Sequence, residues 1–197
     1  MKKLSLKGER QANKSWLMQC LDNSSNVAEF ISMTEEPLSK MDITFYPQIG
    51  ELLSIIGFNS NVTREGDVNC RFDATIIDNH YSIPIEIKSP REDAQINIKS
   101  IRQALENKIV LLSRKFYPTE HEITSLAIAQ YYPPSRSDVF ELIDDIYSAW
   151  EINIGIISLS DLLTLAFKVS KEGYVLNSDY FNHLKGKLDY EKAIAKK

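Results

Sequence analysis

From about position 47 onward, apolar residues recur with a helical period in some stretches and with a strand period in others. Residues 47–58 place four apolar side chains on one stripe of a short helix, which contains Glu51 and ends at Gly57 in a C-cap-like position. Segments 71–78 and 81–88 flank a short polar stretch and predict a β-hairpin. Further helical spacing is found in residues 96–116, 137–150 and 160–173, and further strand-type runs in residues 125–132 and 151–158.

This order of elements predicts an α/β fold. A strand, helix, strand succession implies a right-handed parallel crossover, whereas the hairpin is antiparallel. The central β-sheet should therefore be mixed and flanked by helices. Residues 1–40 are expected to be helical in pieces, with a break at residues 24–26. Because a domain usually takes about 100–200 residues, the 197-residue chain is expected to be one domain, with its core in residues 45–170.

The hairpin carries the candidate chemistry. In the second strand Ile83, Ile85 and Ile87 alternate with Pro84, Glu86 and Lys88, so the carboxylate and the ammonium project from one face while the isoleucines pack behind. If the turn is the two-residue loop 79–80, Asp73 falls directly opposite Glu86, with Cβ atoms about 5 Å apart. The rival first acid, Asp67, shares this facing, but its partner would lie beyond the strand.

Two carboxylates held this close repel each other unless a cation lies between them. Two or three carboxylates with water in the remaining positions suit Mg²⁺ better than Zn²⁺. Lys88 could then orient an attacking water and stabilise charge building on a phosphate oxygen. The Ile87 carbonyl is a further candidate ligand, and Glu51 is a candidate outer ligand or occupant of a second metal position.

The alternative without a catalytic role is a solvated cluster of ion pairs on one strand face. The tripeptide Glu86-Ile87-Lys88 alone is weak evidence for a metal site. Glu106-Asn107-Lys108 has the same spacing of acid and lysine on what should be an exposed helix. The facing of Asp73 and Glu86, together with the order of the flanking elements, favours the metal site.

These residues resemble the PD-(D/E)xK nuclease superfamily, in which an acid, a variable gap and an acid-apolar-Lys triplet lie on a mixed sheet between helices. Asp73, a gap of twelve residues and Glu86-Ile87-Lys88 fit that pattern, although Phe72 stands where the family often has proline. Residues 45–165, and 83–108 above all, look like the cleavage module of type IIS restriction endonucleases. They are most similar to the small catalytic subunits of heterodimeric enzymes.

The resemblance implies that Asp73 and Glu86 bind Mg²⁺, for which Mn²⁺ could substitute. It also implies that Lys88 acts on the attacking water and that Gln103 lies near the site. A solvent-facing helix position is an equally good interpretation of Gln103. Basic residues on and after the same helix could contact DNA phosphates, although such a helix is usually just a solvated face. They are Lys99, Arg102, Lys108, Arg114 and Lys115.

Composition then narrows the expected function. Neither a span of about 18 apolar residues nor a signal-peptide-like N-terminus is present. We therefore expect a cytoplasmic protein that does not associate with a membrane. A nuclease core takes up most of the chain and leaves no DNA-reading motif. With 23 basic against 27 acidic residues the formal charge is −4, which is unfavourable for holding DNA unaided.

The sequence therefore predicts a Mg²⁺-dependent endonuclease that acts on double-stranded DNA. It would be the strand-nicking catalytic subunit of a heterodimeric type IIS restriction enzyme, delivered by a larger subunit that recognises the site. Three alternatives remain open: a self-sufficient homodimeric PD-(D/E)xK nuclease, a noncatalytic DNA-binding or assembly module with the same fold, and an unrelated α/β interaction protein.

Overall fold

A mixed six-stranded sheet forms the centre of the computed structural model, which describes residues 16–42, 44–62, 72–114, 116–118 and 124–196. The strand order is β1-β2-β3-β4-β5-β7; β1, β2 and β3 are antiparallel, and β3, β4, β5 and β7 are parallel. The strands are β1 Ser60–Val62, β2 Ala74–Ile77, β3 Ser82–Ile87, β4 Thr124–Ala129, β5 Asn153–Ser158 and β7 Gly186–Lys187. The predicted mixed sheet is thus confirmed.

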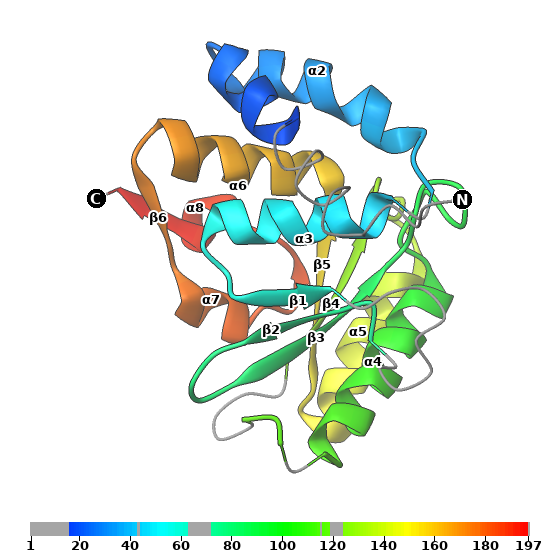
Figure 1. Ribbon diagram of the computed structural model, residues 1–197. Coiled ribbons are helices and arrows are strands. Elements are labelled where there is room, and N and C mark those ends of the chain that lie inside the picture. The colour runs from blue at the N-terminus through cyan, green and yellow to red at the C-terminus, as the bar shows by residue number, and fades with distance from the viewer. Residues whose placement is uncertain (1–15, 43, 63–71, 115, 119–123, 197) are drawn as a thin grey trace, which may run out of the picture.

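Helices cover both faces of this sheet (Figure 1). Helices α3 and α6 lie together on one face, with α2 packed outside α6, and α4 and α5 lie together on the other. The helices are α2 Val27–Ser39, α3 Phe45–Ile56, α4 Ile98–Leu112, α5 Asp138–Trp150, α6 Leu159–Lys171, α7 Ser178–Asn182 and α8 Tyr190–Ala193. A separate antiparallel pair joins β6 Tyr174–Leu176 to β8 Ile194–Lys196.

Local signals in the sequence set several helix ends. The side chain of Asn97 accepts a hydrogen bond from the Ser100 N–H at the start of α4, and Ser100 bonds back to Asn97, which forms a capping box. Ser137 caps α5 as expected, and Gly57 ends α3 with a positive φ of 112° that favours glycine. Residues 16–23 are helical, the predicted break follows, and Asn26 caps α2.

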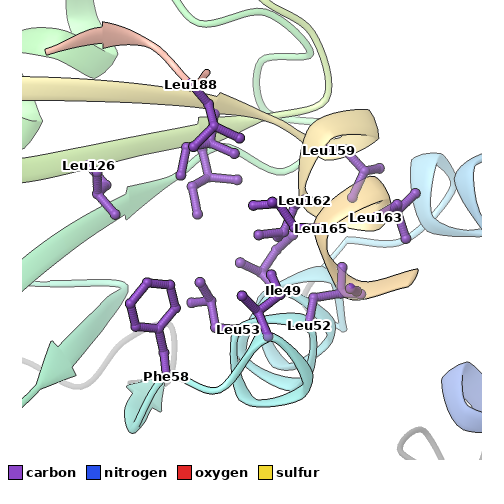
Figure 2. Close-up of a cluster of buried hydrophobic side chains, with 14 of the residues drawn as sticks. Ile49, Leu52, Leu53, Phe58, Leu126, Leu159, Leu162, Leu163, Leu165 and Leu188 are labelled. Carbon is purple, nitrogen blue, oxygen red and sulfur yellow. The ribbon is translucent and has the colours of Figure 1, made fainter. Parts of the chain in front are cut away.

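The larger hydrophobic core lies between the sheet and the α3–α6 layer. Side chains from α3 and α6 point toward one another in Figure 2, with Leu126 of β4 and Leu188 beside them. Ile83, Ile85 and Ile87 of β3 belong to this core. A smaller core joins α4 and α5 to the opposite face of β4 and β5. In the part of the chain described, no helix is long and apolar enough to cross a membrane.

The consequence for the candidate site is the placement of β3. This strand lies between β2 and β4, and all six of its residues are buried. Because its isoleucines fill the larger core, Ser82, Pro84 and Glu86 face the opposite side, where α4 packs on the strand. Glu86 therefore lies between the sheet and a helix.

Candidate active site

The β2–β3 hairpin has the register that the sequence predicts. Ala74 pairs with Ile85 and Ile77 with Ser82, and the Asp78 N–H donates to the Tyr81 carbonyl at 3.0 Å across a two-residue loop. Asp73 directly precedes β2, and its Oδ2 accepts a hydrogen bond from the Ile87 N–H at 2.8 Å. The carboxyl of Asp73 is thus held against the end of β3.

Glu86 and Lys88 form a buried ion pair beside Asp73. The Lys88 Nζ lies 2.9 Å from Glu86 Oε1 and 3.0 Å from Glu92 Oε1, and Glu86 and Lys88 are 5% and 3% exposed. The other carboxylate oxygen of Glu86 accepts a hydrogen bond of 2.9 Å from the Asn107 amide of α4. Charges this well buried are expensive unless they are paired and hydrogen-bonded, and Glu86 and Lys88 meet this condition.

These groups line one pocket of about 460 Å³. Its floor carries the hairpin residues, and its walls come from the start of α3, the turn after β3 and one side of α4. The lining residues are Tyr46, Asp73, Glu86, Lys88, Glu92, Gln103, Glu106 and Asn107.

Burial and charge crowding perturb the acid nearest the hairpin end. Burial, and after it the negative charge of Glu86, raises the pKa of Asp73 from 3.8 to about 7, against the opposing effects of the Ile87 N–H and Lys88. Burial alone would lower the pKa of Lys88, but its pairing with Glu86 and Glu92 raises that pKa above the ordinary value. One lysine therefore does not neutralise the acids of this pocket.

The donor set fits a hard divalent cation. Within the described residues no cluster of three or more His, Cys, Asp or Glu side chains is arranged as a metal site. A cation would be held by the carboxylates of Asp73 and Glu86, and the Ile87 carbonyl remains a predicted further ligand. Few protein oxygens with water in the remaining positions is the arrangement that Mg²⁺ prefers.

Glu51 does not line this pocket. It lines a second pocket of about 640 Å³, together with Gln48 of α3 and Ser60 and Asn61 of β1. Because α3 turns by about 100° per residue, Glu51 points roughly 140° away from Tyr46, which faces the Asp73 pocket. Glu51 is thus not among the residues that line the Asp73 pocket, and its role as an outer ligand stays a prediction.

The residues of α4 divide into three groups. Gln103 lines the Asp73 pocket, where its Oε1 has no hydrogen-bond partner among the described residues. Lys99 and Arg102 are exposed on the helix surface and do not line the pocket. Lys108 is fully buried and donates to the Ser82 carbonyl at 3.0 Å, so the expectation that it reaches DNA phosphates is wrong.

Of the other basic candidates, Arg114 lies over the Phe72 ring at 5.5 Å. Lys115 and the rival acid Asp67 lie outside the described residues.

Sequence reasoning missed Tyr46, Glu92 and Asn107. Asn107 is four residues after Gln103, so both face the same side of α4, and this spacing could have identified it. Glu92 is four residues after Lys88, but only the turn at residues 89–92 brings it back over the lysine. Ser89-Pro90 is a turn signal, but the sequence does not show that this turn places the Glu92 carboxylate beside Lys88.

Comparison with solved structures shows which fold this is. The chain is similar to the restriction endonuclease FokI, with a TM-score of 0.62, and to FokI bound to DNA, with a TM-score of 0.61. In both cases 14% of residues are identical, and the match covers 92% of this chain and 34% of the FokI chain. No protein-family model matches the chain, and no curated protein matches it. The likeness establishes the fold, a mixed six-stranded sheet flanked by helices.

Proposed function

We propose that this chain is a Mg²⁺-dependent DNA endonuclease of the PD-(D/E)xK kind. Its role would be that of the strand-nicking catalytic subunit of a heterodimeric type IIS restriction enzyme. The observation that carries the proposal is the convergence of Asp73, Glu86 and Lys88 in one pocket at the end of β3, where burial and then the charge of Glu86 raise the pKa of Asp73.

Each side chain has a role in phosphodiester hydrolysis. Asp73 and Glu86 hold Mg²⁺, which when bound supplies Lewis-acid stabilisation of charge on a phosphate oxygen. Lys88 presents its ammonium to the attacking water and the developing charge. Asn107 holds the second oxygen of Glu86 and so fixes the direction of that carboxylate. Gln103 has an amide facing the same pocket, where it can bond to the water or to a phosphate oxygen.

The fold supports DNA as the substrate. FokI, to which the chain is similar, is a restriction endonuclease with a solved DNA complex. At 14% identity this similarity does not assign the activity, which depends on the pocket.

Net charge supports a recognition partner. The chain carries a formal charge of −4. A negatively charged chain gains little affinity from DNA phosphates. We therefore propose that a larger subunit binds the recognition sequence and delivers this chain to one strand.

Plasmid nicking tests the proposal without the natural partner. The chain, fused to a DNA-binding domain of known specificity, is incubated with supercoiled plasmid carrying that binding site, with Mg²⁺ or with EDTA. We expect Mg²⁺-dependent nicks near the bound site. Lys88→Ala should lower the nicking rate by about 100-fold or more, because the ammonium acts on developing charge.

The matched control is Lys192→Ala, which removes an exposed lysine on α8 and should nick like the wild type. Nicking by Lys88→Ala at the wild-type rate would contradict the proposal. Specific double-strand cutting by the unfused chain would replace the subunit role with that of a self-sufficient nuclease.

A further inference from the structure

Lys88 is shared between two carboxylates. Its Nζ lies 2.9 Å from Glu86 Oε1 and 3.0 Å from Glu92 Oε1, almost equally close to both. Glu86 is buried within the pocket, whereas the side chain of Glu92 is 43% exposed at the rim. The two acids thus share one ammonium.

The Glu92 carboxylate is itself held in place from two directions. The backbone N–H of Glu92 donates to the Ser89 carbonyl at 3.0 Å and to the Ser89 hydroxyl at 3.3 Å, which closes the turn after β3. Its second carboxylate oxygen accepts a hydrogen bond of 3.2 Å from the Tyr46 hydroxyl on α3. One oxygen therefore faces Lys88 while the other is tied to a neighbouring helix.

Both carboxylate oxygens of Glu86 already have a hydrogen-bonding partner before any cation binds. One oxygen already pairs with Lys88 and the other with Asn107. A divalent cation held by Glu86 and Asp73 would compete with the Lys88 ammonium for Glu86, because like charges at that range repel. A buried ammonium without a carboxylate partner is strongly destabilised, so Lys88 depends more on Glu92 when the cation takes up Glu86.

We propose that Glu92 is a positioning residue that holds the Lys88 side chain in place when Glu86 is occupied by a cation. This inference rests on the proposed metal site, and it goes beyond it by assigning to the chain a lysine-holding acid outside the PD-(D/E)xK triplet. Glu92 thereby lowers the competition of Lys88 for Glu86 and increases the affinity of the Asp73–Glu86 pair for the cation.

A double-mutant cycle tests the positioning role of Glu92. Mn²⁺ binding to the full-length chain is measured by the decrease in the EPR signal of the free ion. Glu92→Gln should weaken Mn²⁺ binding by about fivefold or more, because Lys88 then depends on Glu86 alone. Lys88→Met removes the competitor, so Glu92→Gln should have no further effect in the Lys88→Met background.

Two further variants sharpen the test. Glu106→Gln removes the same charge from the same pocket and should change the Mn²⁺ affinity by less than about twofold. Tyr46→Phe keeps the charge of Glu92 but removes its tether, and should weaken binding in the same direction as Glu92→Gln, by less. Because Glu92 is partly exposed, its variant is expected to fold, which the melting temperature verifies.

The outcomes separate the two proposals. If the wild type binds no Mn²⁺, the proposed metal site itself is refuted, and the role of Glu92 with it. If the wild type binds Mn²⁺ and Glu92→Gln binds it equally well, only the positioning role is overturned. Equal weakening by Glu92→Gln with and without Lys88 also overturns that role, because Glu92 would then be a direct ligand.

Discussion

Asp73 has a carboxyl group whose surroundings disfavour its charged form. Burial and the neighbouring Glu86 raise its pKa to about 7, and the Ile87 N–H offsets this only in part. In an ordinary structural ion pair the carboxyl would instead have a lowered pKa. A raised value in a pocket with a second acid is the pattern expected where a cation completes the site.

This pKa predicts a pH dependence of stability in cation-free protein. Between the ordinary value of 3.8 and about 7, the folded chain keeps a proton on Asp73 that the unfolded chain has released, so the free energy of unfolding falls as the pH rises. The Asp73→Asn variant has no carboxyl to titrate, so it does not lose this stability as the pH rises. Its amide oxygen can still accept the hydrogen bond from the Ile87 N–H. In EDTA we expect the variant to melt about 3 °C or more above the wild type at pH 8, with a smaller difference at pH 5.

Thermal unfolding at the two pH values measures the difference directly. A gap between Asp73→Asn and the wild type that is the same at pH 5 and pH 8 would show that the carboxyl titrates normally in the fold.

Residues of the site were predictable where the geometry is local. A two-residue loop fixes the register of a hairpin, so the facing of Asp73 and the β3 acid followed from the sequence, and the register is confirmed. Glu92 and Tyr46 depend on how a turn and helix α3 pack around that hairpin. Sequence spacing contains no information about those packing distances.

At the scale of elements, α3 combines a predictable stripe with an unexpected polar residue. Its apolar positions were expected from their spacing, but Gln48 lies on the same buried side and is fully buried. Neither amide atom of Gln48 has a hydrogen-bond partner in the described part of the chain. A buried amide without partners costs stability.

Gln48→Met should therefore stabilise the protein, because a side chain of similar shape removes an unsatisfied amide. We expect the free energy of unfolding, measured by urea titration, to rise by about 1 kcal/mol. A fall of similar size would mean that the amide is used, for instance by a molecule bound in the pocket of about 640 Å³ that Gln48 lines.

Element prediction succeeded where the pattern is long or capped. Helices α4, α5 and α6 and strands β4 and β5 all occur where periodicity and caps indicated. Strands β1 and β7 were not predicted, because three residues and two residues are too short to show a period. Both depend on pairing with the strand beside them in the sheet.

At the scale of the molecule, the sheet order gives the site its environment. The antiparallel hairpin joins the parallel strands through β3, so Glu86 stands on an interior strand covered by α4, and Asp73 directly precedes the neighbouring strand β2. A rigid, buried support of this kind holds catalytic groups more accurately than a loop does. The mixed arrangement followed from the order of elements, whereas the C-terminal strand at the sheet edge did not.

Crystals soaked in Mn²⁺ test most directly whether this arrangement is a metal centre. We expect an anomalous peak between the carboxylates of Asp73 and Glu86, with the Lys88 Nζ moved away from Glu86 and still beside Glu92. Crystals with no peak at that position, and with Lys88 Nζ still 2.9 Å from Glu86 Oε1 at saturating Mn²⁺, would contradict a cation-dependent nuclease site on this hairpin.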